Sequence, residues 1–229
     1  MKIGIAMGWR PQPTRIYAWQ AVCSHYAKEF PDVEFFMGDY PSQEYNYSAS
    51  RNIAMDKAIE AGCDVVMMSD ADFIIETASF IEGAMTCYKD QKFVVGYDQL
   101  CLAEEEMSKR IVENGVNWKM IASQIEVNDL NVGGAVFLTP LIYQTINGWD
   151  ERFKNWGYED KAIYLAASTI MGSVKLKGKA VALHHLDRNK SDQQKNANLY
   201  FQYEIRDGQR KEMIELVAGN KIETQVKAA

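Results

Sequence analysis

The chain has 229 residues, of which 47% are hydrophobic and 24% are charged. This is the ordinary composition of a globular protein, and it excludes a collagen, a coiled coil and wholesale disorder. The 25 Lys and Arg residues against 31 Asp and Glu residues give a net charge of −6, which argues against a protein that holds duplex nucleic acid by bulk positive charge.

Hydropathy and cysteine spacing favour a protein of the cytoplasm. The sequence contains no run of about 18 apolar residues, the length needed to cross a bilayer. The apolar stretch at residues 3–7 is too short for the hydrophobic part of a signal peptide and is predicted to be a buried strand instead. The four cysteines (Cys23, Cys63, Cys87 and Cys101) have no metal-ligand spacing, so buried, reduced thiols are favoured over a disulfide. A cytoplasmic protein without membrane contact is the simplest interpretation.

The first half of the chain alternates predicted strands with predicted helices. Strands are expected at 3–7, 33–37, 65–68 and 92–96, and helices at 16–30, 48–61 and 77–88. Pro31 ends the first helix, while Ser48 is a candidate N-cap of the second and Gly62 its end. The alternation predicts βαβ units and an α/β fold with a mostly parallel sheet. Ligands of such sheets bind beyond the carboxyl ends of the strands.

The second half is less regular. A polar helix is expected over about 103–126, a strand at 135–138, a helix at 158–171, and short strands at 174–176 and 180–183. The stretch from Ser191 is predicted to be polar and partly helical, with frayed residues at 221–229. No internal repeat or Gly/Ser linker interrupts the sequence, so one domain is favoured over two.

Two aspartates follow the apolar strand at 65–68 directly, in the sequence Ser69-Asp70-Ala71-Asp72. Extended residues two apart point to the same side, so both carboxylates are expected at the ligand-binding edge of the sheet. Two carboxylates so close repel each other unless a cation compensates them, and a divalent metal that holds a diphosphate does this. The plainer alternative is a solvated turn, but the position after a buried strand favours a functional site.

A glycine pair and an aromatic, acidic stretch form the second signal. Gly133 and Gly134 precede a strand, which suggests backbone that passes close to a ligand. Trp156 is followed by Glu159 and Asp160, and a flat ring beside carboxylates suits a sugar, whose C–H face and hydroxyls they would contact. Both carboxylates are expected in the first turn of a helix, where the dipole keeps them ionised, as a general base requires. For the nearby Trp149 and Phe153, a place in the core is favoured instead.

Two further positions are candidates for metal and anion binding. His185 follows His184 at the end of a short strand, and a neutral imidazole suits an ion that a carboxylate already holds. The alternative is an ordinary surface or core histidine. Arg51 and Asn52 are expected to open a helix, where N–H groups and a guanidinium suit an anion. A solvent-facing arginine is the equally weighted alternative.

Taken in order, the segments Ser50-Arg51-Asn52, Asp70-Ala71-Asp72 and 133–160 resemble metal-dependent GT-A glycosyltransferases. The likeness is to the β-1,4-galactosyltransferases, the galactosyltransferase-like domain of polypeptide N-acetylgalactosaminyltransferases, and small phage or bacterial relatives. It runs from about residue 2 to 198 and implies a GT-A (nucleotide-diphospho-sugar transferase, Rossmann-like) fold. The implied domain spans 1–229, with a nucleotide-binding half (1–98), an acceptor and catalytic half (99–198) and a C-terminal tail (199–229).

The resemblance also implies roles for single residues. Asp160 would be the catalytic base, and Asp72 and His185 would bind Mn²⁺ or Mg²⁺. The nucleotide-sugar donor would contact Arg51, Asp70, Asp72, Gly134 and Trp156, with Asp70 at the ribose and Arg51 by the uridine or its phosphates. The sugar and acceptor would contact Trp156, Tyr158 and Glu159. The chain departs from the family at Tyr158 (Gly in relatives), at Lys161-Ala162 (acidic in relatives) and at Ala182, where vertebrate relatives have a metal-binding Met.

The function implied is a metal-dependent, inverting transfer of a sugar from a nucleotide donor, UDP above others, to an acceptor hydroxyl. Two alternatives keep the fold: a nucleotide- or carbohydrate-binding module without turnover, and a sugar nucleotidyltransferase, for which residues 8–11 are a poor Gly-rich loop. A glycan is the expected acceptor. A modified base in DNA is the second, kept open by the basic residues Lys175, Lys177, Lys179, Arg188, Lys190 and Lys195. The sequence does not indicate the donor sugar or the oligomeric state.

Overall fold

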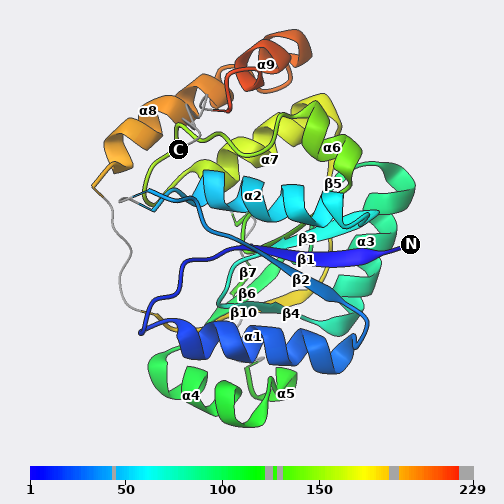
Figure 1. Cartoon of the computed structure of the whole chain (residues 1–229), viewed down its shortest axis with the longest axis vertical. Helices are drawn as coiled ribbons and strands as arrows, with labels where there is room; N and C mark the ends of the chain where they lie inside the picture. The colour runs from blue at the N-terminus through cyan, green and yellow to red at the C-terminus, as the bar shows by residue number, and fades with distance from the viewer. Residues whose placement is uncertain (43–44, 122–125, 128–130, 186–190, 222–229) are drawn as a thin grey trace, which may run out of the picture.

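The computed structural model describes residues 1–42, 45–121, 126–127, 131–185 and 191–221 (Figure 1). The first half alternates as expected: β1 (Ile3–Gly8), α1 (Ile16–Glu29), β2 (Glu34–Gly38), α2 (Tyr47–Glu60), β3 (Val65–Ser69), β4 (Phe73–Ile75), α3 (Thr77–Asp90) and β5 (Phe93–Val95). The second half contains β6 (Gln99–Leu102), α4 (Glu105–Asn114), α5 (Trp118–Ile121), β7 (Glu126–Val127), β8 (Ala135–Leu138), α6 (Pro140–Thr145), α7 (Glu159–Ile170), β9 (Ser173–Lys175), β10 (Lys179–Ala182), α8 (Gln193–Glu204) and α9 (Arg210–Val217).

The central sheet has the strand order β2-β1-β3-β8-β5-β9. Strand β1 pairs in parallel with β2 and with β3, and β5 pairs in parallel with β9, whereas β8 runs antiparallel to both of its neighbours. This confirms the predicted α/β fold with a mostly parallel sheet. All five residues of β3 are buried, because helices cover both faces of the sheet (Figure 1). The carboxyl end of β3 therefore delivers the sequence from Ser69 to Asp72 to one edge of the sheet.

A smaller sheet lies beside this edge, in the order β4-β10-β6-β7. Strand β10 pairs antiparallel with β4 and parallel with β6, so Ala182 lies opposite Phe73 and Leu102. The sequence analysis predicted β10 but neither β4 nor β6. Because Leu183 N–H donates to the carbonyl of Asp72, this sheet fixes the Asp72 backbone next to the segment that carries His185.

Three helix predictions need correction. The helix expected over 103–126 divides into α4 and α5, because Gly115 adopts a φ of +79° at the end of α4. The N-cap of α2 is Asn46 rather than Ser48, since the Asn46 carboxamide accepts the Ala49 N–H at 2.9 Å. Arg51 consequently lies in the second turn of α2 and does not open the helix.

Other expectations about the core are confirmed. Trp149 and Phe153 are 1% and 2% exposed, as predicted for core residues. The four cysteines are free thiols, as predicted, and three of them are buried, whereas Cys23 is half-buried. In the described part of the chain, no helix combines the length and apolarity that a membrane crossing requires.

The stretch after Ser191 is helical, and α8 and α9 pack against α7 (Figure 1). Tyr203 of α8 is buried, and its hydroxyl donates to Asp150 at 2.8 Å. Met213 and Val217 of α9 join the core. Residues 222–229, most of the end expected to fray, lie outside the described residues.

Candidate active site

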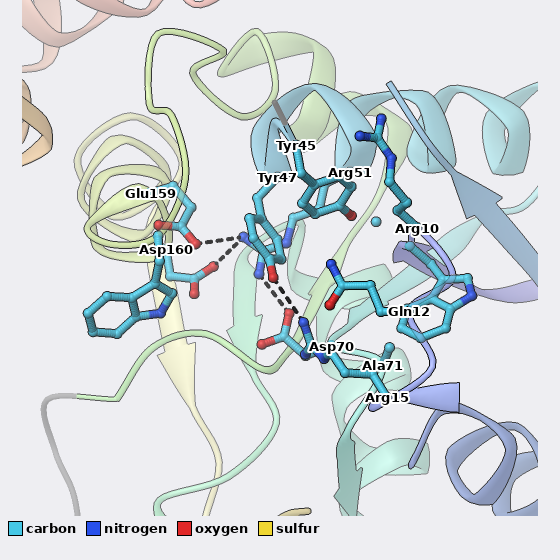
Figure 2. A pocket seen from close by; sticks show the side chains of 13 residues that line it. Arg10, Gln12, Arg15, Tyr45, Tyr47, Arg51, Asp70, Ala71, Glu159 and Asp160 are labelled. Carbon is cyan, nitrogen blue, oxygen red and sulfur yellow. Dashed lines mark hydrogen bonds and ion pairs between the residues drawn. The ribbon is translucent and has the colours of Figure 1, made fainter. Parts of the chain in front are cut away.

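A buried arginine connects the two acidic motifs. Arg51 of α2 is 3% exposed, which excludes the solvent-facing alternative. Its Nη2 donates to Asp70 at 2.7 Å, and its Nη1 donates to Asp160 at 2.8 Å and lies 3.5 Å from Glu159 (Figure 2). One guanidinium thus joins the carboxyl end of β3 to the start of α7. The predicted residues Arg51, Asp70, Glu159 and Asp160 come together as one group.

Glycines at the ends of β1 and β2 let α2 come this close to the sheet. A Cβ on Gly38 would lie 2.0 Å from the Ser50 carbonyl oxygen, and one on Gly8 would lie 3.0 Å from the Arg51 side chain. The sequence analysis did not predict a close helix approach at either glycine. A Gly immediately after a predicted strand is the signal that points to such a close approach.

The glycine pair before β8 lies against the same group. A Cβ on Gly133 would lie 2.3 Å from the Asp160 carboxylate, and Gly134 adopts a φ of +78° while its carbonyl accepts the Asp70 N–H at 2.8 Å. The backbone at this glycine pair does pass close to other groups, as predicted. Those groups are Asp160 and the Asp70 backbone. Gly134 acts on Asp70 through the backbone.

Glu159 and Asp160 occupy the first turn of α7, as predicted. Glu159 is 6% exposed, and its side chain accepts the Gly157 N–H at 3.1 Å. Burial, followed by the adjacent charge of Asp160, raises the pKa of Glu159 to about 7, although Arg51 opposes the shift. The expectation that the helix dipole keeps both carboxylates ionised therefore fails for Glu159, because burial outweighs the dipole.

A pH-dependent stability difference is expected for Glu159→Gln. The pKa of Glu159 rises from 4.5 to about 7 on folding, so its ionisation over this range destabilises the folded state. Gln cannot ionise, and the variant should exceed the wild type in unfolding free energy by about 1–3 kcal/mol at pH 8 and by much less at pH 5. Urea unfolding at both pH values measures this. An equal difference at the two pH values would contradict a raised pKa.

The second aspartate of the motif pairs with the predicted histidine. Asp72 is 2% exposed, and its Oδ2 lies 2.9 Å from His185 Nε2 and 2.9 Å from Arg15 Nη2. The structure thus brings Asp72 and His185 together, and it adds Arg15, which the sequence analysis did not single out. Asp70 and Asp72 line one cavity, as expected of residues two apart at the end of a strand.

We tested whether this pair suits a divalent metal. A carboxylate oxygen and an imidazole nitrogen are both ligands of Mn²⁺. Metal bonds of about 2.1 Å at a right angle place two donor atoms about 3 Å apart, which matches the 2.9 Å between Asp72 and His185. Within the described ranges, no cluster of three or more His, Cys, Asp or Glu side chains forms a metal site, and Ala182 beside the pair supplies no ligand. The pair fits an ion whose remaining ligands come from a substrate.

Two cavities meet at this group of residues. The first is lined by Arg10, Gln12, Arg15, Tyr45, Tyr47 and Arg51 (Figure 2). The second, of about 390 Å³, is lined by Phe73, Tyr97, Leu100, Leu102, Tyr158, Lys161 and the Asp72 region. Asp70, Trp156, Glu159 and Asp160 belong to the walls of both cavities. The first cavity holds only about 20 Å³, so what the structure shows is that the two cavities share a wall of three carboxylates and one tryptophan.

The first cavity contains residues that sequence reasoning missed. Arg10 and Gln12 follow β1, and Tyr45 precedes α2, so both segments lie beyond the carboxyl ends of parallel strands. That position is the only signal in the sequence for them. In the second cavity, the Tyr158 ring stacks on Tyr200 of α8 at 5.3 Å.

Comparison by sequence finds one relationship. Residues 122–175 match the family model described as the N-terminal domain of galactosyltransferase. This segment includes the glycine pair, Trp156 and both carboxylates of α7. The resemblance to galactosyltransferases predicted from the sequence is confirmed. No curated protein matches the chain.

Solved structures with low sequence identity share the architecture. Drosophila β-1,4-galactosyltransferase 7 with manganese, UDP-Gal and xylobiose is 12% identical, with a TM-score of 0.55 and coverage of 84% of this chain and 73% of that chain. S. aureus TarS with UDP-GlcNAc is 11% identical, with a TM-score of 0.55 and coverage of 95% and 71%. The chain has the GT-A fold. GalNAc-T7 with UDP, GalNAc and Mn²⁺ is 13% identical, with a TM-score of 0.50 and coverage of 89% of this chain and 47% of that chain.

In this GT-A fold, the basic residues that kept DNA open as an acceptor are largely neutralised. Lys177 pairs with Asp98 at 2.9 Å, Lys179 with Glu76 at 3.3 Å, and Lys195 with Asp192 at 3.0 Å. The Lys175 ammonium donates to the Asn131 carbonyl. Arg188 and Lys190 lie outside the described residues. The described part of this stretch therefore gives a DNA acceptor no support.

Proposed function

We propose that the chain is a metal-dependent, inverting glycosyltransferase that moves a sugar from a UDP-sugar to a hydroxyl of a glycan acceptor. The observation that carries the proposal is the shared wall of the two cavities, formed by Asp70, Trp156, Glu159 and Asp160. A donor in the first cavity and an acceptor in the second would meet at these side chains. The UDP-sugars and manganese present in the similar structures support this choice of ligands.

We assign the nucleotide diphosphate to the first cavity, which has to widen from about 20 Å³ to admit it. Two arginines line it, Arg10 paired with Asp39 at 2.8 Å and Arg15 paired with Asp72 at 2.9 Å, and a diphosphate would compete with these carboxylates for them. Tyr45 and Tyr47 provide flat rings for a base or a ribose. Asp70, at the junction of the cavities, is placed to accept a ribose hydroxyl. The Arg51 guanidinium already bonds to carboxylates, so its role is to hold them in position rather than to contact phosphate.

Asp72 and His185 would hold the metal ion. When bound, a divalent ion neutralises the charge that develops on the departing diphosphate. Asp72 lines the second cavity next to the shared wall, and His185 contacts Asp72 at 2.9 Å. Their position is thus consistent with a diphosphate that extends from the first cavity to the junction.

Asp160 would act as the general base. The acceptor oxygen attacks the anomeric carbon, the bond from that carbon to the diphosphate breaks, and the hydroxyl proton passes to the Asp160 carboxylate. Arg51, at 2.8 Å, favours the ionised form of Asp160, which a base needs. An acceptor that attacks from the face opposite the diphosphate would invert the linkage in a single displacement.

Glu159 is suited to a different task. Because its pKa is raised to about 7, a neutral carboxyl is available to donate a hydrogen bond to a sugar hydroxyl near neutral pH. Asp160 would thus be the base, and the adjacent Glu159, in a more buried environment, would donate a hydrogen bond to the sugar. Trp156 would cover the apolar face of the sugar between the two cavities.

Chelation and Asp72→Asn test the metal assignment. We expect EDTA to abolish sugar transfer and the variant to lose Mn²⁺ affinity and UDP affinity together, by about tenfold or more, because a neutral amide is a poor ligand. Asp98→Asn is the matched control, because Asp98 is also buried and ion-paired but lies outside both cavities. Calorimetric titration gives both affinities. Full transfer in EDTA would refute the metal site.

A further inference from the structure

Arg15 is a half-buried cation with an incomplete set of partners. Its side chain is 13% exposed, its Nη1 donates to the Tyr47 hydroxyl at 2.9 Å, and its Nη2 donates to Asp72 at 2.9 Å. In the described part of the chain, its Nε is buried and has no hydrogen-bond partner. A guanidinium with a buried, unsatisfied donor gains a hydrogen bond if an additional acceptor enters the site.

Arg15 bonds to Oδ2 of Asp72, the oxygen that would bind a metal together with His185. Both Arg15 and His185 contact Oδ2 of Asp72. A carboxylate buried as deeply as Asp72 requires a cation or hydrogen-bond donors, and in the metal-free protein Arg15 supplies the charge. An ion bound between Oδ2 of Asp72 and His185 would compete with Arg15 for this oxygen.

The charges explain why the displacement needs a second ligand. Arg15 and Asp72 neutralise each other, so a divalent ion that binds Asp72 lies next to the Arg15 guanidinium, whose positive charge repels it. A nucleotide diphosphate brings one negative charge on each phosphate and restores the balance. Arg15 also lines the first cavity, beside Asp70 (Figure 2), so the displaced guanidinium already lies where a diphosphate would arrive.

We infer that Arg15 pairs with Asp72 whenever no metal is bound there, and that metal binding therefore depends on the diphosphate. This inference rests on the proposed function, since it assumes a diphosphate donor and a metal at Asp72. By linkage, the metal and the diphosphate then raise each other's affinity by the same factor. Arg15 is the residue that sets this factor.

The test measures Mn²⁺ affinity by calorimetry or electron paramagnetic resonance, with and without saturating UDP. Wild-type protein should bind Mn²⁺ about tenfold or more tightly when UDP is present, within the usual range of coupling between sites. Arg15→Gln should bind Mn²⁺ alone about tenfold more tightly than the wild type, and UDP should then change its affinity less than about threefold. Arg152→Gln is the matched control, because it also removes an arginine from a buried carboxylate, Asp150, but lies outside both cavities.

Tyr47→Phe keeps the positive charge and removes only the hydroxyl that holds Arg15, so it serves if Arg15→Gln does not fold. It should raise Mn²⁺ affinity in the absence of UDP by several-fold. If neither variant binds Mn²⁺ more tightly than the wild type while Asp72→Asn abolishes binding, the inference about Arg15 is wrong and the proposed function stands. If Asp72→Asn leaves Mn²⁺ affinity unchanged, or UDP does not bind the wild type with Mn²⁺, both are overturned.

Discussion

Asp160→Asn is expected to lower kcat for sugar transfer by about 10²-fold or more and to leave Mn²⁺ and UDP binding close to that of the wild type. Asn cannot take the acceptor proton, but its amide oxygen can still accept from Arg51, whose Nη1 lies 2.8 Å from Asp160 in the wild type. The loss therefore falls on a group that acts in the transition state. Steady-state kinetics with calorimetric donor titration separates the two effects.

Glu159→Gln provides the contrast for this prediction. If Glu159 holds acceptor hydroxyls, the variant should raise the acceptor KM more than it lowers kcat. The linkage made by the wild type should be inverted relative to the donor, which the anomeric proton signal of the product reveals. A retained linkage, or an Asp160→Asn enzyme with nearly normal kcat, would assign the base to another residue.

Arg51→Met is expected to lower the unfolding free energy by about 3–5 kcal/mol at pH 7, and to abolish transfer. The substitution leaves Asp70, Glu159 and Asp160 close together without the cation that joins them, and uncompensated buried charges are costly. Arg51 opposes the raised pKa of Glu159, so without it this pKa should lie further above its ordinary value, and the variant should lose more stability as pH rises and recover part of it towards pH 5.

The control for Arg51 is an arginine in an exposed ion pair. Arg110 of α4 pairs with Glu106 at 3.5 Å, and both side chains are more than half exposed. Arg110→Met should cost less than about 1 kcal/mol. Equal costs for the two variants, measured by urea unfolding, would show that the carboxylates around Arg51 do not depend on its charge.

Much of the central sheet could be predicted because its strands are short apolar runs between turn signals. The strands β1, β3 and β8 follow this pattern, and Gly or Pro residues bound the helices around them. The strands β4 and β6 could not be predicted in the same way. Each has three or four residues and is stabilised by β10, which lies far away in the sequence. Only tertiary pairing identifies such strands.

The chemistry of the site could be predicted more readily than its connections. Asp70, Asp72, Asp160 and His185 follow from acidic or imidazole groups placed after strands or at a helix start. The role of Arg51 could not be predicted, because its partners Asp70 and Asp160 lie 19 and 109 residues away in the sequence. The raised pKa of Glu159 has the same origin, since burial at the junction of the two cavities exceeds any local effect of the helix dipole.

The central claim is most directly tested by incubating the purified protein with a panel of nucleotide sugars, without acceptor, and measuring the nucleoside diphosphate released. Water can replace the acceptor slowly at a site built for transfer. We expect release of UDP from at least one UDP-sugar, stimulated about tenfold or more by Mn²⁺ and lost in EDTA and in Asp72→Asn. No release from any nucleotide sugar, or release that EDTA does not affect, would contradict it.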